Sequence, residues 1–206
     1  MYSLLVLYYV GYGFDSNAKT HWLAVGGKDA IVSLWRINTV LKEGGFLGTG
    51  KKEECDIQLV KLITGFENAI TCVDYDPTLQ ILVCGDRKGN CYWRSVSSGC
   101  LIAVSSMSSL ILPLVKESVK SIQFLKMRIL SNNDTVVLLQ FKIHHSIQFI
   151  LLRLRYSMIL AYKCFSEEIL LPDFFVDENR SIVLLCHQNG FYCCSLSDFN
   201  VSDDRM

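Results

Sequence analysis

The sequence predicts an all-β protein built from about four repeated units of short strands. Half of the 206 residues are hydrophobic, 19% are charged and the formal net charge is zero, which is the composition of a folded domain. Three segments align without gaps as an apolar run, a turn and a second apolar run, and no long helical period is found. A self-similar spacing fixes the architecture more firmly than local propensity does.

The three aligned segments predict three β-hairpins. The distance from the start of the apolar run to the turn is about eight residues in each, from Trp22 to Ala30, from Ile81 to Gly89 and from Ile182 to Gly190. A two-stranded hairpin with Gly, Asp or Asn in its turn requires such a constant distance, whereas a helix does not.

A second apolar spacing predicts the first strand of the second, third and fourth units. Ile70-x2-Val73-x-Tyr75 is followed by Pro77, which marks the point where this strand ends and the chain turns. The same spacing recurs from Val119 to Phe124 and from Leu171 to Val176. We therefore expect units at residues 1–47, 57–110, 115–168 and 170–200, a Gly/Lys/Glu-rich loop insertion at 38–58, and a tail at 201–206.

These residues resemble the WD-repeat family of β-propellers. Gly65-Phe66 followed by Ile70 and Pro77 is similar to the family's Gly-His opening and first strand, and Lys28 to Ile37 is similar to its Asp-Gly turn and Trp-Asp ending. The resemblance implies a partial propeller of about four blades, degenerate in its second half.

The likeness also indicates which residues hold the blades. It implies structural roles in the turns and blade ends for a set of five residues: Asp29, Trp35, Pro77, Gly85 and Gly89. The second unit departs from the family's buried hydrogen-bond set, because Phe66, Lys88 and Arg94 stand at the corresponding positions. We expect the degenerate units to be held by packing alone.

A further resemblance concerns the order of elements. In proteins of the BEACH family, a Trp-ending blade is followed by a long polar insertion and then by a blade that opens with a Leu-Thr-Gly-His-like element. Here Trp35 precedes the 38–58 insertion, and Leu62-Ile63-Thr64-Gly65-Phe66 follows it. This order, over residues 20–105, implies a segment of a larger parent chain that acts in vesicle or lysosomal membrane trafficking.

If the fold is a propeller, recognition by the loops of a rigid rim is the expected function. In the resembled family, the turn between the second and third strands of a blade faces the partner. This implies one partner-binding surface that contains Lys28, Arg87, Lys88, His187 and Gln188. The cations among them would suit an acidic peptide or an anionic head group.

The sequence contains few groups of residues that could support catalysis. His144-His145 are adjacent, so their rings point to opposite faces of a strand. Cys186-His187 and Cys193-Cys194 have metal-ligand elements, but no C-x-x-C pair. The Gly-rich segments contain no phosphate-binding fingerprint. We expect no enzyme activity, no metal and no cofactor.

The cysteines and the charge balance bear on compartment and partners. The nine cysteines are odd in number and scattered, which favours reduced thiols and a cytoplasmic protein, with peripheral membrane association left open. A nuclear chromatin or RNA adaptor on the same fold is the alternative, but direct nucleic-acid contact would need a basic stripe that the neutral charge disfavours.

The uncharged stretch 95–115 approaches the length of a membrane span, although seven serines, a glycine and a proline interrupt it and no transmembrane segment is expected. Other proteins, or the rest of a larger chain, are the expected partners.

Overall fold

The computed structural model describes residues 9–15, 20–42, 52–114, 122–130, 136–143, 146–153, 158–166, 170–177, 182–187 and 190–195. These residues form four antiparallel sheets and one short helix, so the all-β prediction is confirmed.

Each sheet contains strands that follow one another along the chain and pair with their sequence neighbours. Sheet 1 contains β1 (Tyr9–Asp15), β2 (Thr20–Gly26), β3 (Val32–Lys42) and β4 (Lys52–Ile63). Sheet 2 contains β5 (Ile70–Asp76), β6 (Ile81–Asp86), β7 (Asn90–Ser95) and β8 (Leu101–Ser106). Sheet 3 contains β9 (Gln123–Leu130), β10 (Val136–Ile143), β11 (Ser146–Arg153) and β12 (Met158–Ser166), and sheet 4 contains β13 (Leu170–Asp177), β14 (Ile182–His187) and β15 (Gly190–Ser195).

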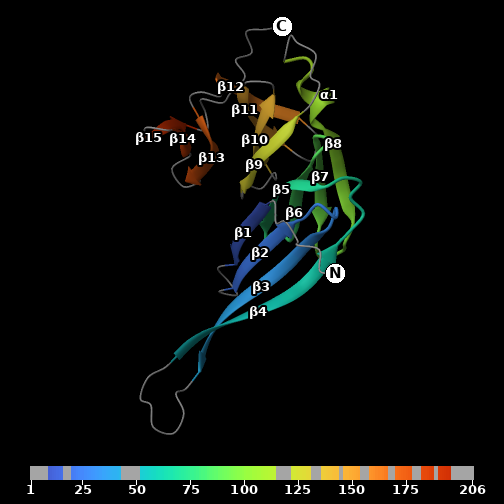
Figure 1. Cartoon of the computed structure of the whole chain (residues 1–206), viewed down its shortest axis with the longest axis vertical. Helices are drawn as coiled ribbons and strands as arrows, with labels where there is room; N and C mark the ends of the chain where they lie inside the picture. The colour runs from blue at the N-terminus through green and yellow to red at the C-terminus, as the bar shows by residue number, and fades with distance from the viewer. Residues whose placement is uncertain are drawn as a thin grey trace.

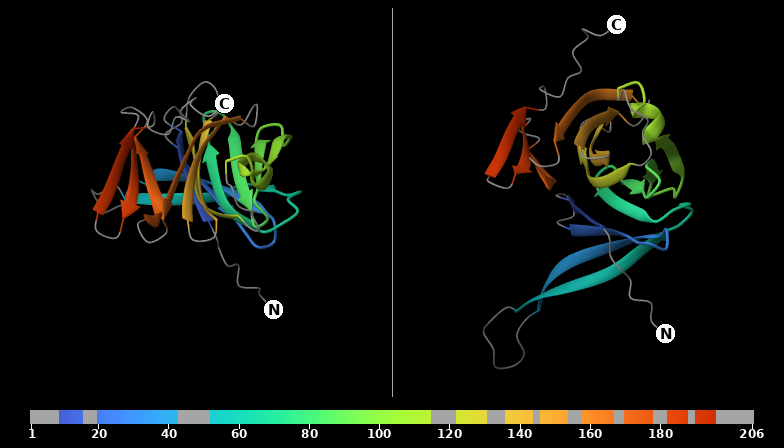
Figure 2. Two further views of the ribbon diagram at one scale, coloured as in Figure 1. Left: turned by 90° about the horizontal axis from the view of Figure 1, so that it is seen from above. Right: turned by 45° about the horizontal axis from the view of Figure 1, so that its top comes forward.

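The sheets follow one another around an arc. Figures 1 and 2 show the order from sheet 1, in blue, through green and yellow to sheet 4, in red, with the first strand of each sheet toward the inside. Strand β5 contacts both β1 and β9, and β9 also contacts β13. The first strands of successive sheets are therefore neighbours, although they lie far apart in the sequence.

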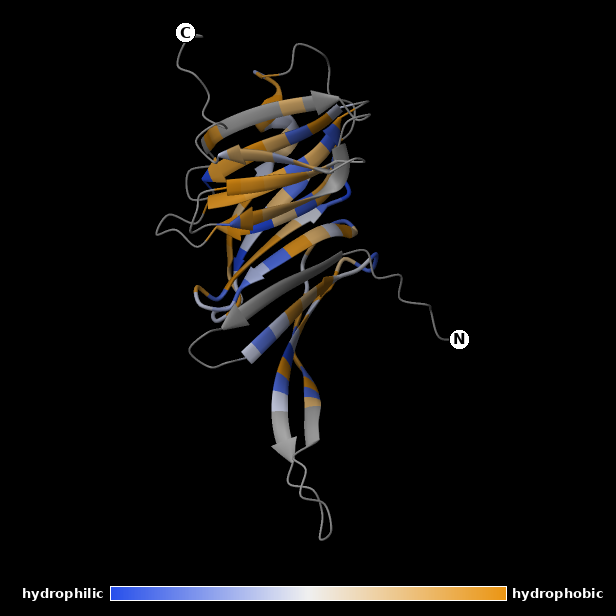
Figure 3. Ribbon diagram, turned by 90° about the vertical axis from the view of Figure 1, so that its left-hand side faces the viewer, coloured by the Kyte–Doolittle hydropathy of each residue, from blue (hydrophilic) through white to orange (hydrophobic). Residues whose placement is uncertain are grey.

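Three separate apolar clusters lie between the four sheets. One joins sheets 1 and 2 around Leu34 and Tyr75, one joins sheets 2 and 3 around Val83 and Leu139, and one joins sheets 3 and 4 around Phe149. Alternate residues of a strand point to opposite faces, so sheets 2 and 3 each contribute one face to each of two clusters. Figure 3 shows the resulting concentration of apolar residues in the stacked upper strands.

One expected unit boundary falls inside a strand of the structure, and the expected loop insertion is partly strand. The expected boundary at residue 57 falls inside β4, which pairs with β3 and completes sheet 1. The insertion expected to be a loop over 38–58 has strand at both flanks, because β3 runs to Lys42 and β4 begins at Lys52. Cross-strand pairs such as Thr39 with Cys55 continue the ladder past Ile37, the last β3 residue that pairs with β2, and the hairpin projects as an arm (Figure 1).

The uncharged stretch that begins at Ser95 is divided between elements. It contains the end of β7, all of β8 and the five-residue helix α1 (Met107–Ile111). Among the described residues, no helix is long and apolar enough to cross a membrane.

Candidate functional site

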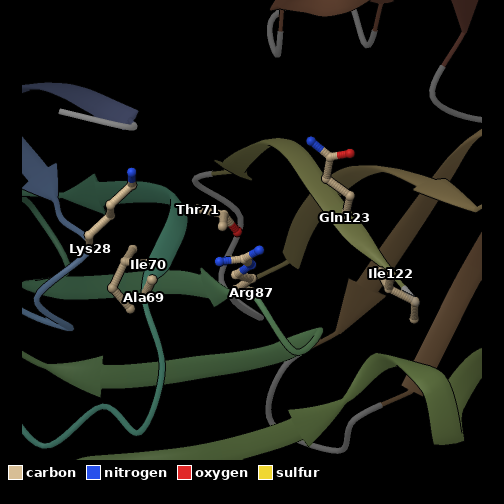
Figure 4. A pocket seen from close by; sticks show the side chains of 7 residues that line it. All are labelled: Lys28, Ala69, Ile70, Thr71, Arg87, Ile122 and Gln123. Carbon is tan, nitrogen blue, oxygen red and sulfur yellow. The ribbon is translucent and has the colours of Figure 1, made fainter. Parts of the chain in front are cut away.

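A pocket of about 550 Å³ opens where turns and strand ends of sheets 1, 2 and 3 meet. Its lining comes from the β2–β3 turn, the start of β5, the β6–β7 turn and the start of β9: Lys28, Ala69, Ile70, Thr71, Arg87, Ile122 and Gln123. Figure 4 shows the guanidinium of Arg87 between the Ala69–Thr71 segment and β9. Three sheets therefore build one pocket from residues that lie up to 95 positions apart in the chain.

The turn that carries Lys28 is fixed by backbone hydrogen bonds. Gly27 N–H donates to Ile31 O at 3.1 Å, and Ala30 N–H donates to Gly27 O at 3.3 Å. The same Gly27 carbonyl accepts from Ile70 N–H at 3.0 Å, which joins this turn of sheet 1 to the first strand of sheet 2. Lys28 is exposed at the tip of the turn, so its backbone is positioned while its ammonium group can reach a ligand.

The turn that carries Arg87 is held by a buried carboxylate. Oδ1 of Asp86 accepts from Lys88 N–H at 2.9 Å and from Asn90 N–H at 2.8 Å. Arg87 N–H donates to Ala69 O at 2.9 Å, which fixes this turn against the start of β5. The backbone on both sides of the pocket is thus preorganised, which reduces the entropy lost when a ligand binds.

Lys28 and Arg87 occupy equivalent positions in two successive sheets. Lys28 lies six residues after Trp22, and Arg87 lies six residues after Ile81, in the aligned hairpins. Both turns end on a residue with positive φ, 59° at Ala30 and 84° at Gly89. The repeat itself therefore places both cations in the lining of the pocket.

The pocket combines these cations with neutral walls. Among the described residues that line it, none is acidic, and none is a histidine or cysteine. The Thr71 hydroxyl donates to Gly85 O at 3.3 Å, and its oxygen can still accept a further hydrogen bond. Cationic rims with apolar and hydroxyl walls suit an anionic group on a partly apolar ligand.

The remaining predicted rim residues are placed differently. Lys88 lies on the same turn as Arg87, where it is exposed, but it is outside the pocket lining. His187 ends β14 in sheet 4, and its side chain and all of Gln188 lie outside the described residues. Thr71 and Gln123 were missed by the sequence analysis, because they begin first strands and no spacing in the sequence shows which strand ends meet.

Of the residues expected to be structural, the two in sheet 1 make local polar contacts. Oδ1 of Asp29 accepts from Ile31 N–H at 3.2 Å, within its own turn. Nε1–H of Trp35 donates to Ser33 Oγ at 2.9 Å, and the Ser33 hydroxyl donates to Val25 O at 3.4 Å. The last of these bonds links β3 to β2.

The other three lie in sheet 2. Pro77 begins the β5–β6 turn, and its carbonyl accepts from Gln80 Nε2–H at 2.7 Å. A Cβ at Gly85 would lie 2.6 Å from atoms of Cys72 and Phe124, so glycine permits the close approach of sheets 2 and 3. The φ of Gly89 lies in the left-handed region that glycine favours.

Phe66 packs against sheet 2 through an aromatic and a cation–π contact. The ring of Phe66 meets Tyr92 edge to face at a centroid distance of 5.2 Å, and the Arg94 guanidinium lies 4.7 Å from the Phe66 centroid. Arg94 Nη2–H also donates to Gly65 O at 3.1 Å. Two of the three residues that differ here from the resembled pattern, Phe66 and Arg94, therefore contact one another.

The cysteine and histidine pairs do not assemble into a described metal site. By register, Cys186 and Cys193 share one face of sheet 4, whereas Cys194 lies in the cluster on the other face. His144-His145 lie outside the described residues. No group of three or more candidate metal ligands occurs within the described part of the chain.

Comparison with known proteins shows similarity of fold. No protein-family model and no curated protein matches the sequence. The chain is similar to the crystal structure of the computationally designed Ika4 protein, with 13% sequence identity, a TM-score of 0.55 and coverage of 94% of this chain and 93% of that chain. The similarity extends over nearly the whole of both chains, so the four sheets are matched as one arrangement.

Proposed function

We propose that this protein is a non-catalytic interaction scaffold that binds an acidic peptide segment of a partner protein at the pocket between Lys28 and Arg87. The observation that carries the proposal is the position of these two cations, which the repeat places on preorganised turns around one cavity. Fixed cations at the rim of a cleft attract opposite charge and raise the encounter rate.

The walls of the pocket favour a peptide over an isolated small anion. Half-buried Ala69 supplies apolar surface beside the cations, with the buried Ile70 and Ile122 behind the lining. A peptide carboxylate can pair with Arg87 while the flanking apolar side chain contacts these walls.

We propose that the architecture is a segment of a WD-repeat β-propeller. The support is the meander order of every sheet, the packing of successive sheets face to face, and the meeting of their first strands on the inside of the arc. Rim turns then carry recognition while the strands hold them.

The cellular setting that we propose is cytoplasmic membrane trafficking, within a BEACH-type parent chain. The order of a Trp-ending blade, a long insertion and a Leu-Thr-Gly opening supports the parent chain. The nine free cysteines support a reducing compartment.

Binding of an acidic peptide can be tested with matched variants. An array of fluorescent peptides rich in Glu and Asp, each paired with a Gln/Asn version, is measured by fluorescence anisotropy against the whole chain. We expect Arg87→Gln to weaken binding about tenfold and Lys28→Gln to weaken it by a similar factor. Lys88→Gln is the control, because Lys88 is exposed on the same turn but outside the pocket.

Two results would refute the proposal. Equal binding of the acidic peptides and their amide versions would show that the cations do not select charge. Equal weakening by Arg87→Gln and Lys88→Gln would show that only the general charge of the turn matters.

A further inference from the structure

Thr71 differs in kind from the other polar residues that line the pocket. Lys28 and Arg87 carry only N–H donors, and the exposed amide of Gln123 can turn either its donor or its acceptor toward a ligand. The hydroxyl of Thr71 is already engaged, because it donates to Gly85 O at 3.3 Å. A carbonyl oxygen can only accept, so the direction of this bond is fixed and the lone pairs of Thr71 Oγ1 remain for a ligand.

A β-bulge positions this hydroxyl. The pairing of β5 with β6 shifts register between Ile70 and Cys72, so Thr71 is the extra residue of β5. Such a bulge changes the direction of a side chain. Thr71 and Arg87 line the same pocket, and Figure 4 shows the Thr71 hydroxyl pointing toward Arg87. Arg87 N–H donates to Ala69 O at 2.9 Å, so the two segments that carry this acceptor and this cation are joined before a ligand binds.

The two kinds of group select two features of one ligand. The cations attract an anionic group, whereas Thr71 Oγ1 needs an N–H or O–H donor. A ligand that offers only acceptors would leave this oxygen without a partner or displace its bond to Gly85 O, and each costs free energy in a part-buried site. A peptide offers both features, since each acidic residue carries a backbone N–H close to its carboxylate.

We propose that Thr71 is the residue by which this pocket selects peptides over other anions. Its hydroxyl oxygen accepts a hydrogen bond from a backbone N–H of the ligand, while Arg87 pairs with an acidic side chain of the same peptide. This role rests on the proposed function, and it adds the group that recognises the main chain. The pocket then distinguishes an acidic peptide from a free anion that carries no donor, which charge alone would not do.

Amide-to-ester substitution in the ligand tests the role of Thr71. The probe is a fluorescein-labelled pentapeptide of alternating Leu and Glu, prepared with each backbone N–H in turn replaced by an ester oxygen. An ester keeps the charge and the approximate shape of the peptide but removes one donor. Fluorescence anisotropy with the whole chain is expected to show one position at which the ester weakens binding about fivefold.

A double-mutant cycle then assigns that N–H to Thr71. Thr71→Val has nearly the same shape and no hydroxyl, so we expect it to weaken binding of the all-amide peptide about fivefold and to bind the ester equally well. Thr71→Ser retains the hydroxyl and should keep the full effect of the ester. Thr64→Val is the matched control, because Thr64 is exposed and outside the pocket lining. Thermal melts check the folding of each variant, and Thr71→Ala replaces Thr71→Val if valine prevents folding.

Two outcomes would overturn the role of Thr71 while leaving the proposed function intact. Esters that bind as well as the all-amide peptide at every position would show that no backbone N–H is recognised. An ester effect that persists in Thr71→Val would assign the N–H to another acceptor. A different result marks failure of the proposed function itself: if the pentapeptide bound no better than its Leu/Gln version, the cations would not select charge and both proposals would fall.

Discussion

The hydroxyl of Tyr92 donates a hydrogen bond to Oδ2 of Asp86 over 3.1 Å, inside sheet 2. Burial raises the pKa of Tyr92, and the nearby carboxylate raises it further, so the phenol remains a donor. The same Oδ2 accepts from the side-chain amides of Asn68 at 3.0 Å and Asn90 at 2.9 Å. One fully buried carboxylate thus ties β7 and the β4–β5 connection to the turn that presents Arg87.

Replacing Asp86 is therefore expected to destabilise the protein more than replacing an exposed aspartate. Asp86→Ala leaves several buried donors without an acceptor, and we expect it to lower the free energy of unfolding by about 3 kcal/mol. Asp29→Ala, which removes one bond in an exposed turn, is expected to cost about 0.5 kcal/mol. Urea denaturation measures both, and equal losses would contradict the central role of Asp86.

Substitutions at the equivalent turn residues Ala30 and Gly89 are expected to change the stability of the protein in opposite directions. Both have positive φ, which is costly for alanine and free of strain for glycine. We expect Ala30→Gly to raise the free energy of unfolding by about 0.5 kcal/mol and Gly89→Ala to lower it by about 1 kcal/mol or more. The second loss is larger because the new Cβ would lie 3.1 Å from Ile122 Cβ. Thermal melts that show both changes with the same sign would contradict this account.

The carboxyl of Asp74 predicts a dependence of stability on pH. It accepts a hydrogen bond from Ile129 N–H at 2.7 Å and lies 3.5 Å from Arg128 Nη1. Burial raises its pKa to about 6, against the opposing effect of Arg128, and Asp76 adds to the rise. Between the unfolded value of 3.8 and about 6 the folded state binds the proton more tightly, so stability falls as pH rises through this window and then levels off.

The Asp74→Asn variant separates the contribution of this carboxyl to the pH dependence of stability from that of other groups. The difference of about 2 pKa units corresponds to about 3 kcal/mol of stability that is present below pH 4 and lost above pH 6. Asp74→Asn cannot titrate but retains an acceptor oxygen, so its stability should vary less across the window. The measurement is the free energy of unfolding of both proteins between pH 4 and pH 7. Parallel curves would assign the pH dependence to other groups.

The thiols predict a selective pattern of alkylation. Burial raises the pKa of Cys72 and Cys84 well above the ordinary range and that of Cys91 to about 12, so few thiolates form there at neutral pH. We expect iodoacetamide to modify these three only when the protein unfolds. Peptide mass spectrometry will compare them with the exposed thiols, which serve as internal controls: Cys55, Cys100, Cys164 and Cys193. Rapid native-state labelling of Cys84 would contradict the burial.

The sequence predicts the hairpins well because their period is local. An apolar run with a turn eight residues after its start locates β2–β3, β6–β7 and β14–β15. The extent of β4 is harder to predict, since Lys52 to Asp56 are mostly charged and read as loop. Pairing with the arm of β3 overrides that local preference, because backbone bonding across the strands is specified by the partner and not by the segment itself.

The sequence predicts only those residues of the candidate site that occupy repeated turn positions. The turn positions indicate Lys28 and Arg87, which lie together at the pocket. Thr71 and Gln123 come from strand starts in sheets 2 and 3, and their convergence depends on how whole sheets pack. A spacing within one hairpin carries no information about that packing.

The strictly sequential order of the strands has a consequence for unfolding. Each apolar cluster joins only adjacent sheets, so the total stability approximates a sum of nearest-neighbour terms along a one-dimensional array. Sheets 2 and 3 have a neighbour on either side, whereas sheets 1 and 4 have one each. Fraying should therefore start at the ends of the arc, and the last amides to exchange with deuterium should be those of β5, β6, β9 and β10.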